Sequence, residues 1–165
     1  MKKELDALLC SRYPLIFADR HAPMTQSCMY WGFSCGDGWF DLIDTLCARL
    51  QFATDHNKAP QVVATQVKEK WGMLCFYYWG GNNEQSGMVD MAEALSERIC
   101  EECGKPGKRR VSGAYMMISP SASAHCSITS SSVRHLSQGR FAQTSARTCF
   151  SISMSGWSQS ATRTT

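Results

Sequence analysis

Two runs of strand-forming residues, 61–68 and 73–79, most constrain the fold of this chain. The first run, Gln-Val-Val-Ala-Thr-Gln-Val-Lys, is rich in β-branched residues, and the second, Met-Leu-Cys-Phe-Tyr-Tyr-Trp, is aromatic. Both residue types favour strands, and residues 69–72 between them suit a turn, so the pattern predicts a β-hairpin. Because side chains alternate along a strand, one face holds Leu74, Phe76 and Tyr78, and the other holds Cys75, Tyr77 and Trp79.

Three segments with helical periodicity accompany the hairpin. The clearest spans 38–55, and its predicted buried stripe consists of Trp39, Ile43, Leu46, Cys47 and Leu50. A second spans 84–99, with a predicted stripe of Met88, Met91, Ala92, Leu95 and Ile99. A shorter helix is expected over 2–12. The sequence therefore predicts an α+β fold, in which two or three amphipathic helices pack an aromatic β-hairpin or small antiparallel sheet.

A Cys-x-x-Cys motif follows the third helix. Cys100 and Cys103 are separated by two residues and followed by Gly104, a spacing typical of a zinc knuckle. We therefore expect Cys100 and Cys103 to bind zinc as the cofactor. A structural zinc ion takes four ligands, and Cys28 and Cys35 are one candidate source of the other two. The alternative interpretation is a pair of uncoordinated thiols at a helix end.

The composition changes after about residue 112. All 14 acidic residues lie in 1–110, whereas 111–165 contain no Asp, Glu or Lys and are rich in Ser and Thr. We therefore expect a compact domain over 1–112 and a tail over 113–165 that is disordered or frameshifted. The frameshift hypothesis rests on Met116, Met117 and Ile118, whose codons ATG-ATG-ATH encode Asp-Asp in a neighbouring frame.

Four blocks of the sequence resemble a group of uncharacterised small phage and prophage proteins. The blocks are a Cys-Gly-Asp-Gly-Trp-Phe motif within 32–40, a Lys-Glu-Lys-Trp-Gly turn within 66–72, the aromatic run 76–78 and the knuckle 100–107. In those proteins a second Cys/His pair tends to follow the knuckle, which implies a complete zinc site. This chain departs from that pattern, because no second Cys-x-x-Cys or Cys-x-x-His follows; the Cys and His residues after the knuckle are the adjacent His125-Cys126, His135 and the distant Cys149. The resemblance implies no known activity.

Aromatic and basic residues form the candidate partner-binding set. It consists of Trp71, Tyr77 and Trp79 in the hairpin and Lys105, Lys108, Arg109 and Arg110 beside the knuckle. Three interpretations are open for the hairpin aromatics: core packing, protein docking, or stacking on the bases of a nucleic acid. We expect a protein partner, with nucleic acid as the second choice, and no membrane partner.

The expected function is that of a non-enzymatic phage accessory protein that binds a host or phage macromolecule. No nucleophile, base and orienting group occur together in a recognisable pattern. Asp37, Asp41 and Asp44, spaced i, i+4 and i+7, give the main alternative, a metal-dependent nuclease-like enzyme. A nucleic-acid-binding zinc module is the third hypothesis. Because the first residues are charged and no long apolar run occurs, we expect the cytoplasm of a bacterial host.

Overall fold

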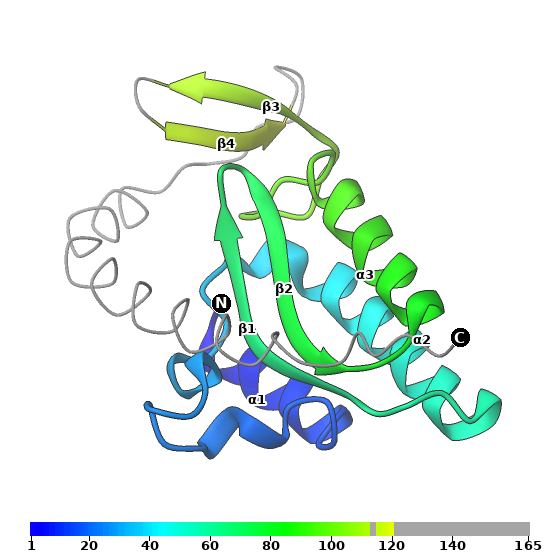
Figure 1. Ribbon diagram of the computed structural model, residues 1–165. Helices are drawn as coiled ribbons and strands as arrows, with labels where there is room; N and C mark the ends of the chain where they lie inside the picture. The colour runs from blue at the N-terminus through cyan, green and yellow to red at the C-terminus, as the bar shows by residue number, and fades with distance from the viewer. Residues whose placement is uncertain (113–114, 121–165) are drawn as a thin grey trace, which may run out of the picture. The chain divides into compact units, whose positions relative to one another are not determined.

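A computed structural model of the chain describes residues 1–112 and 115–120. The helices are α1 (Lys3–Arg12), α2 (Phe40–Asn57) and α3 (Asn83–Ser96), and short 3-10 turns cover Ala18–His21, Cys28–Trp31 and Asp37–Trp39. The strands are β1 (Val62–Lys70), β2 (Met73–Gly80), β3 (Gly107–Ser112) and β4 (Tyr115–Pro120). They form two separate antiparallel hairpins, β1–β2 and β3–β4 (Figure 1). The predicted α+β class is confirmed.

The β1–β2 hairpin closes through a two-residue loop. Lys70 pairs with Met73, and both loop residues have positive φ angles, 58° at Trp71 and 77° at Gly72. This backbone matches the right-handed twist of the strands, as in type I′ turns. The predicted alternation of faces is confirmed, because Leu74 and Phe76 are buried whereas Trp79 on the opposite face is 58 % exposed.

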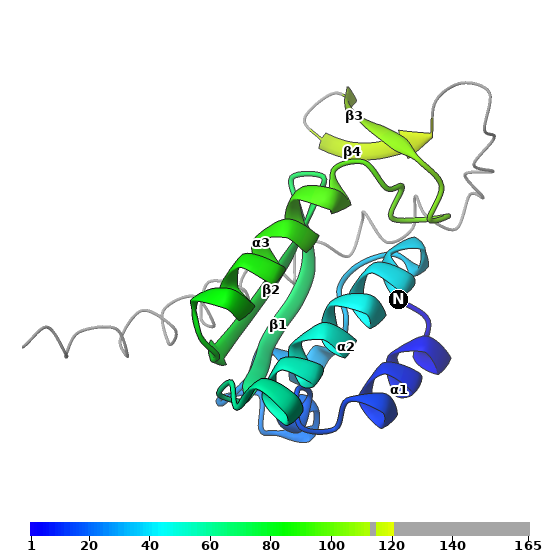
Figure 2. The ribbon, with the colours of Figure 1, turned by 90° about the vertical axis from the view of Figure 1, so that its right-hand side faces the viewer.

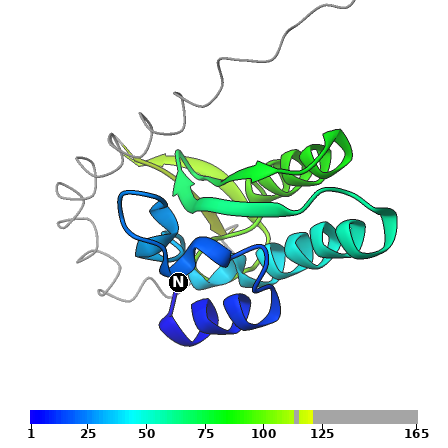
Figure 3. The same cartoon turned by 60° about the horizontal axis from the view of Figure 1, so that its bottom comes forward.

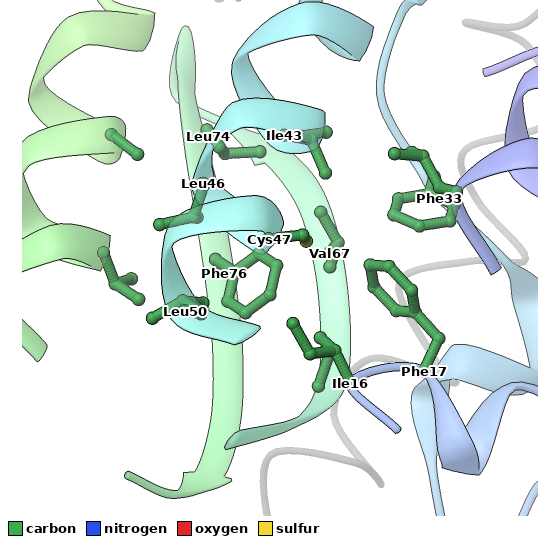
Figure 4. Close-up of a cluster of buried hydrophobic side chains, with 14 of the residues drawn as sticks. Ile16, Phe17, Phe33, Ile43, Leu46, Cys47, Leu50, Val67, Leu74 and Phe76 are labelled. Carbon is green, nitrogen blue, oxygen red and sulfur yellow. The ribbon is translucent and has the colours of Figure 1, made fainter. Parts of the chain in front are cut away.

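Helix α2 supplies one side of the core. Its predicted stripe is confirmed, and the closely packed part of the core also includes Ile16, Phe17 and Phe33 from the segment after α1 (Figure 4). The helix lies between the β1–β2 hairpin and α1 (Figure 2 and Figure 3). Polar contacts hold α1 to α2: the Tyr13 hydroxyl donates to the backbone carbonyl of Asp44 at 3.1 Å, and Arg12 pairs with the Asp44 carboxylate at 2.9 Å.

Both outer edges of the β1–β2 hairpin are hydrogen-bonded by other parts of the chain. At the β1 edge, the Ala64 amide donates to the carbonyl of Ile16 at 2.8 Å, and Ser34 forms a bridge with Lys68. At the β2 edge, two side chains of α3 accept backbone hydrogen bonds. The Leu74 amide donates to Ser96 Oγ at 2.8 Å, and the Phe76 amide donates to Glu93 Oε1 at 2.7 Å. Such coverage prevents a short sheet from pairing with other chains.

The predicted buried stripe of the third helix is only partly correct: Ala92 is buried and Met88 and Ile99 are partly buried against the core, but the other two members are exposed. Met91 and Leu95 are 66 % and 45 % exposed, and the buried residues of α3 are Gln85, Val89, Ala92 and Ser96. The helix is rotated because polar groups on this face meet buried backbone donors and acceptors. Gln85 completes a capping box with Asn82 and donates to the carbonyl of Leu50, while Ser96 accepts from β2. The helix also ends at Ser96 rather than at 99.

The β3–β4 hairpin was not anticipated from the sequence. Its register runs from Gly107 opposite Pro120 to Ser112 opposite Tyr115, and Ile118 in β4 is buried. Residues 115–120 of the predicted tail thus form a strand; residues 113–114 and 121–165 lie outside the described part of the chain, and for them the disordered or frameshifted tail stays a prediction. Within the described residues, no helix has the length and apolar content needed to cross a bilayer.

The β2 edge gives the first testable prediction. Replacing Ser96 with Ala leaves the buried Leu74 amide without its acceptor, so Ser96→Ala should lower the free energy of unfolding by about 1–3 kcal/mol. Ser86→Ala, near the start of the same helix, is the matched control and should change stability by about 0.5 kcal/mol or less. Urea denaturation of both variants measures the difference. Equal stabilities for the two variants would contradict the role of Ser96.

Candidate metal centre and partner surface

The first candidate site is the cysteine turn, residues 100–104. The Gly104 amide donates to the carbonyl of Cys100 at 2.9 Å, and the Cys100 amide donates to the carbonyl of Lys105 at 2.9 Å. Gly104 has a φ of 70°, in the left-handed region that glycine adopts without steric cost. The chain therefore reverses sharply at the two cysteines, and an antiparallel bridge between Ile99 and Pro106 follows on the outside of the turn.

The two thiols of the turn lie close enough for Cys103 to raise the pKa of Cys100. The backbone amides of Glu102 and Cys103 lie near the Cys100 thiol. Burial raises the pKa of Cys100, and these amide hydrogens act in the opposite direction because they stabilise the thiolate. Amides directed at a cysteine sulfur, together with a second sulfur beside it, are what a thiolate-bound metal ion requires on one side.

The cysteine turn is docked on the glycines that precede α2. The Gly38 amide donates to the carbonyl of Glu101 at 2.6 Å, and Trp39 Nε1 donates to the carbonyl of Ile99 at 2.9 Å. A Cβ atom on Gly38 would lie 2.3 Å from the Gly104 nitrogen and 2.4 Å from the Cys100 oxygen. Only glycine permits this approach of two backbones, because the atoms that a Cβ would meet are backbone atoms of the cysteine turn, which cannot shift unless the whole turn shifts.

The cysteine turn contains a glutamate, Glu101, whose side chain is largely buried. Burial, and then the neighbouring Glu69 and Glu102, raise the pKa of Glu101 to about 7. The Gly36 amide donates to the Glu101 carboxylate and partly offsets this shift. Cys35 lies in the same region, and its pKa is raised to about 12, first by burial. Cys35 is therefore an unreactive core thiol at neutral pH.

The structure brings Cys100 and Cys103 together but adds no further ligand from the described residues. No group of three Cys, His, Asp or Glu residues within 1–112 and 115–120 is arranged to hold a metal ion. Cys28 and Cys35 are both buried and do not complete such a group. The expectation that these two cysteines supply the other ligands is therefore not met. The pair offers two ligands of the four that zinc requires.

The three aspartates of the nuclease hypothesis are not assembled into one site. Asp37 lies in the 3-10 turn before α2 and pairs with Lys2 at 3.1 Å, and Asp44 pairs with Arg12. Asp41 is exposed on α2. Asp37 and Asp44 are thus held by separate cations, and their i, i+4, i+7 spacing does not give a shared metal site in the described structure.

The second candidate site is the outer face of the β1–β2 hairpin with its loop. We call it the hairpin stripe; its members are Lys68, Lys70, Trp71, Cys75, Tyr77 and Trp79. Trp71 and Trp79 are 59 % and 58 % exposed, and the Lys68 ammonium lies 5.2 Å from the centre of the Tyr77 ring. Burial, and then Lys70, lower the pKa of Lys68. Phe76 is in the core, so only part of the aromatic set serves core packing.

Trp71 has an unusual backbone conformation for its residue type. Its φ of 58° lies in the left-handed region, which a non-glycine residue adopts at a cost of about 1–2 kcal/mol. Asn or Gly is the usual first residue of such a loop. The loop is closed independently of the indole, because the Gly72 amide donates to Glu69 Oε1 at 2.7 Å. The chain therefore keeps an exposed tryptophan where the backbone favours other residues.

The four basic residues predicted beside the knuckle do not share one surface, because three of them alternate along β3. Lys105 lies in the loop after the cysteine turn, and Lys108, Arg109 and Arg110 are successive exposed strand residues. Strand alternation puts Lys108 and Arg110 on one face and Arg109 on the other. Arg109 lies 3.8 Å from Glu97, at the end of α3. These four residues therefore do not form a single basic patch.

The sequence interpretation missed the part of Gly38 and Trp39 in the site. The sequence places Gly38 at the start of the helix 38–55 and Trp39 in its buried stripe, yet together they hold the cysteine turn. The signal available in the sequence was the pair of glycines on both sides of Asp37, since close backbone approaches favour glycine. Its partner segment, 60 residues later in the chain, could not be identified from spacing alone.

Comparison of the chain with family models, curated proteins and solved structures gives no significant match. The resemblance to small phage and prophage proteins therefore stays a prediction.

The docking of the cysteine turn gives the second prediction. Gly38→Ala introduces a Cβ atom against the backbone of residues 100–104, so it should lower the free energy of unfolding by about 1–3 kcal/mol. Gly87→Ala is the control, because nothing lies within 4 Å of its added Cβ atom. In the interior of α3 that substitution should raise stability by about 0.5–1 kcal/mol. Thermal denaturation compares the two; stabilisation by both changes would contradict the close approach.

Proposed function

We propose that this chain is a non-enzymatic binding module that docks a protein partner on its hairpin stripe. The observation that carries the proposal is Trp71, an exposed tryptophan in a left-handed loop position that costs the folded chain stability. Strain of this kind persists where a side chain is needed for recognition. Trp79 and Tyr77 extend the same surface along β2.

The size and composition of the hairpin stripe fit a protein interface. Tryptophan and tyrosine are enriched among residues that dominate binding energy, and apolar surface surrounded by polar groups marks interaction sites. Trp71 lies in the loop and Trp79 near the far end of β2, and the six steps from Met73 to Trp79 correspond to about 20 Å along the strand. Two anchors at that separation suit one standard protein interface.

The charge of the hairpin stripe favours a protein partner over a nucleic acid. The stripe contains two cations, Lys68 and Lys70, and Lys68 is partly buried against Tyr77. Residues 1–110 carry slightly more acidic than basic residues. Nucleic-acid affinity depends on neutralising several phosphates, and two lysines are too few positive charges for that.

Substitution of the exposed tryptophans gives the third prediction. Trp71→Asn should raise the free energy of unfolding by about 1 kcal/mol, because Asn tolerates the left-handed loop position. The same change should weaken capture of the partner by tenfold or more, as should Trp79→Ser. The measurement compares the proteins that immobilised full-length variants retain from a lysate of the cells that produce the chain.

Phe52→Ser is the matched control, because Phe52 is an exposed aromatic of α2 outside the hairpin stripe. It should retain the same partner as the unmodified chain. A parallel titration with single-stranded DNA and RNA follows the quenching of tryptophan fluorescence. Tight, salt-dependent quenching that Lys68→Met and Lys70→Met abolish would replace the protein partner with a nucleic acid. Equal capture by all variants would exclude the hairpin stripe.

We also propose that Cys100 and Cys103 bind a zinc ion that stabilises this end of the fold. The sharp turn at Gly104, the proximity of the two thiols and the amides near Cys100 support this proposal. A bound ion would fix the turn against Gly38 and thereby the start of α2. We propose a structural role for this ion, because a cysteine pair in a tight turn is typical of structural zinc sites.

Metal titration gives the fourth prediction. The full chain should bind Co²⁺ with the near-ultraviolet absorption of thiolate coordination, and Zn²⁺ should displace it. Zinc at a hundredfold excess over its dissociation constant should stabilise the fold by about 2.7 kcal/mol. Cys103→Ser should abolish both effects. Cys75→Ser, a partly exposed cysteine of the hairpin stripe, should leave them unchanged. Retention of thiolate absorption by Cys103→Ser would disprove the assignment.

A further inference from the structure

Helix α3 has an apolar side that the core leaves exposed. Met91 and Leu95 are 66 % and 45 % exposed, and Met88 is only partly buried against the core. Intervals of three and four residues separate these side chains, so they lie on one side of the helix. Glu84 and Arg98 extend that side at its two ends. We call this set the α3 stripe; its members are Glu84, Met88, Met91, Leu95 and Arg98.

The neighbours of α3 within the fold leave the α3 stripe uncovered. The helix packs on α2 and β2, and its side chains Gln85, Glu93 and Ser96 form the hydrogen bonds that hold it there. On the outer side of α3, away from α2 and α1, no element of the described residues lies against the helix (Figure 2 and Figure 3). Among the large apolar side chains of these residues, Met91 is the most exposed. An apolar surface of this kind marks an interaction site.

The spacing of the α3 stripe is that of a seam between two helices. Along its five members the intervals are four, three, four and three residues, the pattern of a and d positions in a coiled coil. The helix ends at Ser96, but the turn continues, because the Arg98 amide donates to the carbonyl of Leu95 at 2.9 Å. Gly87 and Ala94 are exposed and flank the stripe, and their small size permits a second helix to approach closely.

The order of charges along the α3 stripe identifies the second helix. Met91 is the midpoint of the stripe, seven residues from Glu84 and seven from Arg98. When the stripe is reversed about Met91, a carboxylate therefore lies opposite a guanidinium at each end. We propose that α3 packs antiparallel on α3 of a second copy of this chain, with the two-fold axis at Met91. Such a contact uses the same surface twice and closes on itself.

The charged ends of the α3 stripe are available for this contact. Glu84 and Arg98 are both exposed, and neither forms an ion pair within residues 1–112 and 115–120. In the antiparallel arrangement, the Glu84 carboxylate of each copy meets the Arg98 guanidinium of the other, and Met88 meets Leu95. A parallel arrangement would instead bring like charges together at both ends. The antiparallel arrangement also places the positive end of one helix dipole beside the negative end of the other.

The test is sedimentation of the full chain over a range of protein concentrations at low salt. The α3 stripe spans about 21 Å of helix, so we expect a weak, reversible dimer. Met91→Lys brings two like charges together at the axis and should raise the dissociation constant of the dimer by about tenfold or more. Met24→Lys makes the same change at an exposed methionine outside α3 and should leave the constant unchanged. Circular dichroism checks that both variants remain folded.

Exchange of the two charges tests the orientation of the helices. Glu84→Arg alone, or Arg98→Glu alone, brings like charges together at both ends of the contact and should weaken the dimer by about threefold or more. The double variant Glu84→Arg/Arg98→Glu restores opposite charges and should recover the original affinity. A monomer at every concentration, or a dimer that Met91→Lys leaves intact, would overturn the proposal. Failure of the double variant to recover the affinity lost in the single variants would overturn the antiparallel pairing.

Discussion

The close approach of two backbones at Gly38 is the constraint that joins the distant parts of this chain. It brings the residues before α2 to within hydrogen-bonding distance of the cysteine turn, and the buried indole of Trp39 adds a second bond to Ile99. The other end of the connection is equally defined, because Ser96 is bonded to Leu74 only four residues before Cys100. The β2 edge, α3, the cysteine turn and the start of α2 therefore form a closed series of contacts. Together these contacts position the two thiols relative to the core.

Sequence periodicity predicted the elements whose buried faces are apolar. The alternation in β1–β2 and the stripe of α2 are confirmed, because hydrophobic burial alone orients these elements. It was only partly right for α3: Ala92 is buried as predicted, but Met91 and Leu95 are exposed, and the inward face also holds Gln85 and Ser96. Those residues are inside because they satisfy backbone groups of other elements, and a hydrophobic pattern contains no information about which distant amides need acceptors.

The candidate sites show the same limit. The local geometry of Cys100 and Cys103 followed from their spacing and from Gly104, and the structure has the sharp turn that this predicts. The aspartate trio also had a regular spacing, yet Lys2 and Arg12 engage two of its members from a different part of the chain. Spacing on one helix states which side chains share a face. It does not state which oppositely charged groups the fold brings to that face.

Lys58 and Trp71 both have backbone angles in the left-handed region, which costs a non-glycine residue conformational free energy, and the fold explains only one of the two. Lys58 has a φ of 58° directly after α2, where the left-handed conformation ends a helix and lets its amide bond to the carbonyl of Ala53. At Lys58 the unfavourable conformation is therefore explained by the end of the helix. Trp71 has the same φ, but its loop is closed by Gly72 and Glu69, and its indole is 59 % exposed. An Asn-Gly loop would close the hairpin at lower cost, so the fold itself does not account for a tryptophan at position 71, whereas the proposed docking surface gives its indole a role.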